Sequence, residues 1–149
     1  MDTIAELSRR EATEVAETIL EARSGDDDWL DELSEALDRR RAGRTLGRIL
    51  EVWDLSQAEA ARLFGVSRQA LSKWLVGGVP AERAVAVADL AAATDLLVRY
   101  VRRERIPAVV RRKAPALGGE SLIDWVARSR TRGVLEACRQ MFAFGEAQR

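Results

Sequence analysis

Residues 57–74 of the chain read QAEAARLFGVSRQALSKW, and this stretch decides the fold. Ser56, directly before it, and Glu59 have the spacing of a capping box, which starts a helix. Gly65 supplies the positive φ that a tight turn requires, and it ends this first helix. Ser67 can cap a second helix that begins directly afterwards. The stretch therefore predicts two short helices joined by a tight turn.

The apolar residues of this stretch predict how the two helices pack. Ala61 is small enough for two helix backbones to approach each other where they cross at a steep angle. Val66, Leu71 and Trp74 then fix the second helix on the first. Each position has a packing reason, and together they predict a helix-turn-helix.

The charged residues around the second helix all have the same sign. No acidic residue occurs between Arg62 and Val79, although 32% of the chain is charged. A solvated surface in such a chain normally mixes the two signs, whereas phosphate binding needs a basic surface. We therefore expect this surface to bind DNA. The alternative is that the helix-turn-helix serves only as a packing scaffold, with ordinary residues on its surface.

The stretch resembles the phage-repressor (Xre) type of helix-turn-helix. That type opens with a Ser-Gln pair, here Ser56-Gln57, and has Gly-Val-Ser before its recognition helix, here Gly65-Val66-Ser67. The resemblance implies that the recognition helix lies in the major groove of DNA. On that basis the DNA-binding residues are Gln57 and Ser67 at phosphates and Arg68, Gln69, Ser72 and Lys73 at base edges. Arginine can pair with guanine, and glutamine with adenine, through two hydrogen bonds.

Helical patterns also occur outside the motif. The basic cluster Arg39–Arg41 and Gly43 mark a helix boundary, and Pro80 suits the first turn of a long helix. This long helix is apolar over so much of its circumference that we expect it to be buried on two sides, by its own domain and by a neighbour. The expected helices span about residues 4–22, 29–37, 46–53, 81–103, 121–128 and 132–144, with a short basic helix after Pro107.

Length and composition agree with a helical protein. The chain has 149 residues, of which 47% are hydrophobic and 5% aromatic. Alanine and leucine dominate the apolar residues, which favours helices over sheets. We predict an all-α fold with three parts. They are an acidic helical arm (residues 1–42), a helix-turn-helix domain with its long connecting helix (43–103), and a small helical C-terminal domain (104–149).

The two signs of charge are separated along the chain, although the net charge is zero. Residues 1–38 carry 13 acidic and 3 basic residues, and residues 39–149 carry 11 acidic and 21 basic residues. An acidic arm thus precedes a basic body. The arm could be an oligomerisation element, a cover for a basic surface, or added packing.

The C-terminal part carries a second motif. Residues 115–126 read PALGGESLIDWV, and residues 142–145 read FAFG. This pattern resembles the toxin-binding domain of the Xre/MbcA/ParS antitoxins, although Leu122 stands where that family often has proline and Val126 where it often has leucine. Together with the helix-turn-helix, the resemblance covers about residues 45–145. It implies that the partner is a RES-domain toxin, which depletes NAD, and that the antitoxin itself does no chemistry.

The same region is rich in apolar and basic side chains. It contains more apolar surface than three short helices can easily hide, so part of it is expected to contact a partner. Aromatic residues often dominate interface energy, and arginines suit acidic groups on a toxin. The predicted toxin-binding residues are Trp125, Arg128, Arg130, Arg132, Phe142 and Phe144. Alternatively, these residues merely close a small core. The resemblance implies that the C-terminal end approaches the NAD pocket of the toxin.

Histidine is absent and Cys138 is the single cysteine, which rules out histidine-based triads, histidine metal sites and cysteine-cluster zinc sites. We expect no enzyme activity, no cofactor and no metal. Cys138 is expected in the core of the last helix as a small apolar residue. No apolar run reaches the length of a membrane span, and the N-terminus lacks the order of a signal peptide, so the cytoplasm is the expected location.

These observations predict an antitoxin that binds a RES-like toxin and represses its own operon through operator DNA. A homodimer is expected, because one recognition helix covers only a half-site. Two alternatives stay open. One is a stand-alone transcriptional regulator whose C-terminal helices dimerise, and the other is a protein-interaction module that keeps the helix-turn-helix as a scaffold.

Overall fold

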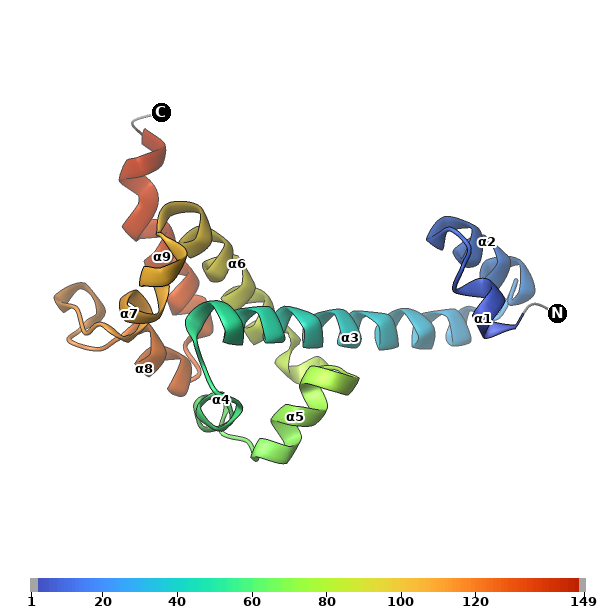
Figure 1. Ribbon diagram of the computed structural model, residues 1–149, viewed down its shortest axis with the longest axis horizontal. Coiled ribbons are helices and arrows are strands. Elements are labelled where there is room, and N and C mark those ends of the chain that lie inside the picture. Colours follow the sequence, from blue (N-terminus) through green and yellow to red (C-terminus); the bar gives the residue numbers. More distant parts are fainter. Residues whose placement is uncertain (1–2, 148–149) are drawn as a thin grey trace. The chain divides into compact units, whose positions relative to one another are not determined.

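The computed structural model describes residues 3–147, and the side chains of residues 3–143. This part of the chain is helical (Figure 1), with a single isolated bridge between Ala114 and Glu120, so the predicted all-α fold is confirmed. The helices are α1 (Ile4–Leu7), α2 (Ala12–Ala22), α3 (Asp27–Trp53), α4 (Gln57–Phe64), α5 (Arg68–Gly77), α6 (Ala84–Tyr100), α7 (Ile106–Arg111), α8 (Leu122–Ala127) and α9 (Thr131–Ala147). No helix within residues 3–147 is long and apolar enough to cross a membrane.

The chain divides into two compact units, Met1–Leu37 and Asp38–Arg149. In the first unit, the Thr3 hydroxyl caps α1, and Glu6 returns a hydrogen bond to the Thr3 N–H at 2.8 Å. Helix α2 has an apolar face, yet no described side chain of this unit is fully buried. Ile4, for example, is 87% exposed. The first unit is therefore a small helical segment without a core of its own.

Helix α3 corrects one prediction. The boundary expected at Arg39–Arg41 and Gly43 is wrong, because a single helix runs from Asp27 to Trp53. Gly43 lies inside this helix, where a Cβ atom would come within 2.4 Å of the Trp74 carbonyl oxygen. The glycine therefore marks a close approach of two backbones and not the end of a helix.

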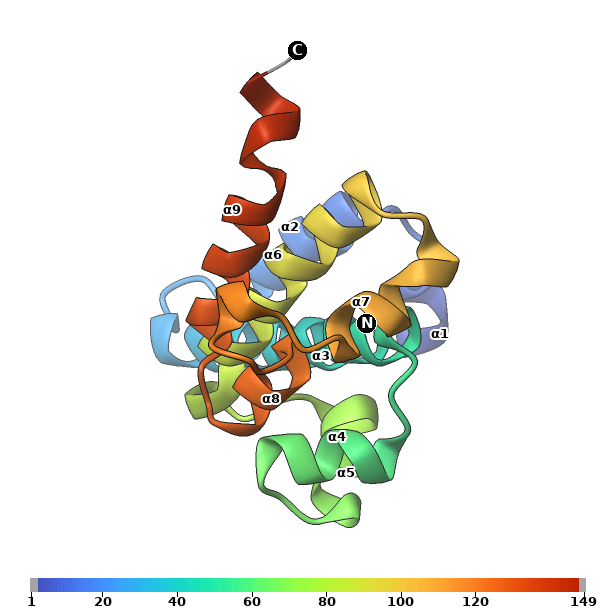
Figure 2. The same ribbon diagram turned by 90° about the vertical axis from the view of Figure 1, so that its left-hand side faces the viewer.

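The core of the second unit is built from α3, α6, α7, α8 and α9 together with the helix-turn-helix. Trp53 is fully buried, and its indole N–H donates a 2.9 Å hydrogen bond to the hydroxyl of Thr94 on α6. Helix α6 packs extensively along α9 (Figure 2). Cys138 on α9 is buried, and this burial raises its pKa to about 11, which confirms it as a small apolar core residue.

The long helix begins later and ends earlier than expected. Pro80 precedes a short 3-10 turn, Ala81–Arg83, and α6 itself spans Ala84–Tyr100. Its C-terminal limit is set by Val101, which is extended. Val85 in its first turn is 72% exposed. The short basic helix after Pro107 is present as α7, and the two last helices are confirmed as α8 and α9.

Candidate functional site

The predicted helix-turn-helix is present as α4, a tight turn and α5. The Ser56 hydroxyl accepts from the Glu59 N–H at 3.1 Å, and the Glu59 carboxylate accepts from the Ser56 N–H at 2.8 Å. This backbone hydrogen bond lowers the pKa of Glu59, because it favours the ionised carboxylate. Gly65 ends α4 in the left-handed region with φ of 66°. The capping box and the turn glycine therefore act as the sequence predicts.

Helix α5 is anchored on α4 by its apolar side. Leu71 is fully buried and Trp74 is 7% exposed. The Trp74 ring meets the Phe64 ring edge-on, with centroids 6.0 Å apart. The Arg83 guanidinium group lies over the Trp74 ring, 5.6 Å from its centroid, and it donates a hydrogen bond to the Phe64 carbonyl at 3.0 Å. The predicted packing roles of Leu71 and Trp74 are confirmed.

The C-terminal end of α5 is fixed against α3 by backbone contacts. The Val79 N–H donates to the Arg39 carbonyl at 3.0 Å. At Gly78, where φ is 121°, a Cβ atom would lie 2.8 Å from the Arg39 carbonyl carbon. Gly43 faces the Trp74 carbonyl on the other side of this contact. Two glycines thus set the orientation of α5, a role that the sequence motif does not reveal.

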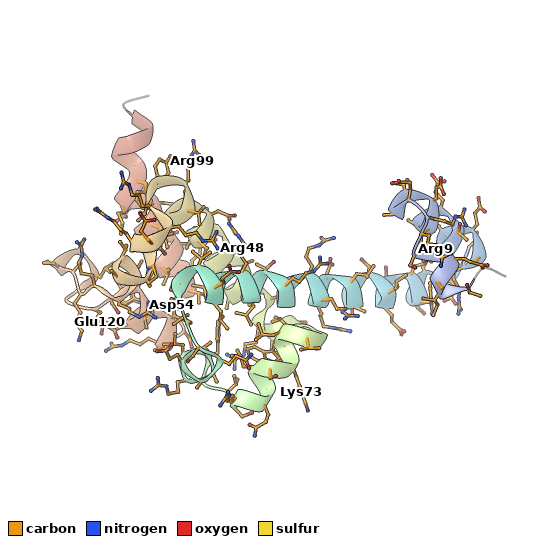
Figure 3. The ribbon with its side chains drawn as sticks, in the orientation of Figure 1. Arg9, Arg48, Asp54, Lys73, Arg99 and Glu120 are labelled. Carbon is orange, nitrogen blue, oxygen red and sulfur yellow. The ribbon has the colours of Figure 1, made fainter. Side chains whose placement is uncertain are left out.

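The predicted DNA-binding residues lie on the outer side of this motif. Gln57, Ser67, Arg68, Gln69 and Lys73 are exposed, and Ser72 is half-buried. Figure 3 shows the Lys73 side chain on α5. Neither Arg68 nor Lys73 has an ion-pair partner among the side chains that the structure describes. The exposed side of α5 is therefore basic and free of carboxylates from its own segment.

Ser67 has a structural role beside its predicted contact with DNA. Its hydroxyl oxygen accepts a hydrogen bond from the Ala70 N–H at 3.0 Å and thereby caps α5. A hydroxyl can accept and donate at the same time, so its hydrogen stays available for a phosphate oxygen. The N-terminus of α5 also carries the positive end of the helix dipole, which favours an anion at this position.

The second predicted site begins at α8. Gly118 and Gly119 have φ values of 69° and 80°, and they form the turn before this helix. The Ser121 hydroxyl accepts from the Asp124 N–H at 3.1 Å, and Asp124 accepts from the Ser121 N–H at 2.8 Å. This backbone hydrogen bond lowers the pKa of Asp124. Ser121 is thus the cap that the sequence predicts.

The three predicted rim arginines do not share one environment. Arg128 pairs with Glu120 at 2.5 Å. Arg132 pairs with the buried Asp89 of α6 at 3.4 Å. Arg130, in contrast, lies over the Trp125 ring, 4.3 Å from its centroid. Of the three, Arg130 is the one without a carboxylate partner among the described side chains, so its guanidinium group differs from the other two in being unpaired.

The predicted aromatic contacts also differ from one another. Trp125 is half-buried and lines a cavity beside α9. Phe142 is half-buried, and its ring stacks on Tyr100 with centroids 4.9 Å apart and an interplanar angle of 17°. Phe142 therefore joins the ends of α6 and α9. Phe144 lies in α9, but its side chain is outside the described ones.

No protein-family model and no curated protein sequence matches the chain. Among solved structures, it is similar to a chain in the crystal structure of the M. tuberculosis MbcT-MbcA toxin-antitoxin complex. The identity is 20%, the TM-score is 0.55, and the match covers 66% of this chain and 91% of that chain. The protein thus shares its all-α fold with a chain of the MbcT-MbcA complex, which agrees with the resemblance of its sequence to antitoxins.

Proposed function

We propose that the protein is the antitoxin of a type II toxin–antitoxin pair, which neutralises a RES-like, NAD-depleting toxin and represses its own operon. The observation that carries this proposal is the fold shared with a chain of the MbcT-MbcA complex over 91% of that chain's length. The motif at residues 115–126 and the helix-turn-helix at residues 57–74 support the same function independently. The protein acts by binding, and it needs no cofactor for this role.

Complex formation is the experiment that tests the antitoxin role. The chain is expressed together with a RES-like protein, taken from the reading frame adjacent to its own gene if that frame encodes one, and the mixture is separated by size-exclusion chromatography. We expect the two proteins to elute together. If they elute separately at micromolar concentration, the stand-alone regulator becomes the better account.

For DNA binding, the proposal assigns base recognition to α5 and phosphate contacts to its surroundings. Arg68→Ala should lower the preference for the operator over a scrambled site by about 1–3 kcal/mol, because a bidentate arginine–guanine contact is lost. Arg62→Ala is the matched control. It should weaken binding to both sequences alike and lower the salt slope by about one. Fluorescence anisotropy with both DNAs at several salt concentrations measures the two effects.

The base-reading assignment is contradicted if Arg68→Ala binds the operator as tightly as the parent chain. The fold should survive this change, because Arg68 is exposed and Leu71 and Trp74 hold α5 in place. A circular-dichroism melting curve checks that the variant is folded.

We further propose that two copies bind paired half-sites about one helical turn apart. The exposed Val85 in the first turn of α6 is one apolar residue available to such a dimer. Analytical ultracentrifugation should give the mass of a dimer without DNA, and the mass of a dimer plus one duplex with operator DNA. A monomer mass without DNA, together with a single protein copy on each duplex, would contradict this proposal.

A further inference from the structure

A cavity of about 550 Å³ lies between α9 and the segment that joins α7 to α8. Its apolar wall includes Leu117, Ala137 and Met141, and its polar wall includes Arg112, Arg130 and Gln140. The Trp125 ring lines it as well. Figures 1 and 2 show the segment after α7 looping beside α8. The cavity combines an apolar floor with a basic edge, which is a composition suited to an amphipathic ligand.

The charges around the cavity are not balanced. Arg112 and Arg130 have no carboxylate partner among the described side chains, whereas Arg128 and Arg132 are paired. The single acidic residue of the lining is Glu136, which interacts with Arg132 at 3.7 Å. Two guanidinium groups are therefore available at the cavity, and a guanidinium group can bind a carboxylate through two parallel hydrogen bonds.

Trp125 adds a second incomplete interaction. Its indole nitrogen is buried and has no hydrogen-bond acceptor among the described residues. An unpaired buried donor costs about 1–3 kcal/mol of stability. The ring packs on Gly133, where a Cβ atom would lie 3.1 Å from the ring carbons, and Arg130 covers the ring at 4.3 Å.

We propose that this cavity binds an acidic peptide segment of the toxin, a statement that rests on the proposed function. A carboxylate of the segment pairs with Arg130 and Arg112, and an adjacent apolar side chain packs on Leu117 and Met141. Charge complementarity selects this occupant, because the uncompensated groups at the cavity are basic while its floor is apolar.

A peptide titration tests the chemistry of the site without the toxin. The probe is an acetylated Leu-Glu-Leu-Glu-Leu amide, and the control is the same peptide with glutamine in place of glutamate. The full-length chain is labelled with ¹⁵N, and its indole N–H signals are recorded as each peptide is added to about 5 mM. Trp125→Phe assigns the Trp125 signal among those of the four tryptophans. We expect the acidic peptide to shift this signal saturably, and the glutamine peptide to leave it in place.

Charge variants localise the effect. The double variant R112Q/R130Q should raise the dissociation constant at least about tenfold, because it removes both charge-assisted pairs. R102Q/R105Q removes the same number of charges from exposed positions outside the cavity and should have no such effect. Ala116→Glu, at an exposed position of the lining, should weaken binding by repulsion. Equal shifts with both peptides, or unchanged binding by R112Q/R130Q, would overturn the site.

Co-elution with the toxin then tests the occupant. R112Q/R130Q should weaken the complex of the chain with the RES-like protein, while R102Q/R105Q should leave it intact. If the wild-type chain binds the toxin and R112Q/R130Q binds it equally well, the cavity is not the contact and the proposed function stands. If the wild-type chain itself does not bind the toxin, the proposed function fails.

Discussion

Gly43→Ala is expected to destabilise the second unit by about 1–3 kcal/mol, in spite of the gain in helix propensity that alanine brings. The new Cβ would lie 2.4 Å from the Trp74 carbonyl oxygen, so α5 must move away from α3. The carbonyl belongs to the backbone, and no side-chain rotation can relieve the contact. Because α5 carries the proposed base-reading residues, its displacement should also weaken operator binding.

Gly47→Ala is the matched control in the same helix. Its new Cβ would approach the Leu75 side chain at 3.8 Å, which is an ordinary van der Waals contact. It should therefore raise stability by up to about 1 kcal/mol through helix propensity alone. Urea denaturation of the two variants and the parent chain measures the difference. If Gly43→Ala is as stable as Gly47→Ala, the close approach of α3 and α5 is not what requires the glycine.

Deletion of residues 143–149 is expected to abolish neutralisation of the toxin and to weaken the toxin complex by about thirty-fold or more, the loss typical of an interface hot spot. The segment includes Phe144 and the end of α9, which the resemblance to the Xre/MbcA/ParS antitoxins leads us to expect near the NAD pocket of the toxin. The fold should survive, because the deletion keeps Cys138 and Phe142, the last inward residues of α9 that the structure describes. Growth of cells that express the toxin with either form of the chain measures neutralisation.

Operator binding and two point variants serve as controls for this deletion. The shortened chain should bind operator DNA with unchanged affinity, which shows that it is folded. Phe144→Ala should reproduce part of the loss, while Arg139→Ala, at an exposed position of α9 outside the cavity lining, should have a smaller effect on neutralisation. Full protection by the shortened chain would place the toxin contact elsewhere.

The helix-turn-helix could be predicted because its determinants are local. Ser56 and Glu59 cap one another across three positions, and Gly65 takes the left-handed conformation that its place in the motif requires. The burial of Leu71 and Trp74 follows from helical spacing in the same way. Such short-range rules need no knowledge of the remaining chain. The same holds for the start of the second motif, where Ser121 caps α8 together with Asp124, three positions later.

The remaining features depend on residues that are distant in the sequence. From the sequence, Gly43 is predicted to end a helix. Its actual role depends on Trp74 of another helix, whose backbone lies close to it. Arg132 looks available for a partner until Asp89, 43 positions earlier, is found beside it. Arg112 belongs to no recognisable sequence motif. Its proposed role follows only from the fold, which brings it to the cavity beside Trp125. Tertiary neighbours, which no local pattern encodes, decide these roles.

As an antitoxin, the chain is expected to protect cells from an NAD-depleting toxin by binding it. The most direct test is the NAD content of cells in which the cognate RES-like toxin is induced, with and without the chain. We predict that NAD falls when the toxin is induced alone and stays at its uninduced level when the chain is expressed with it. An equal fall of NAD in both cultures, with the chain present and folded, would contradict the account.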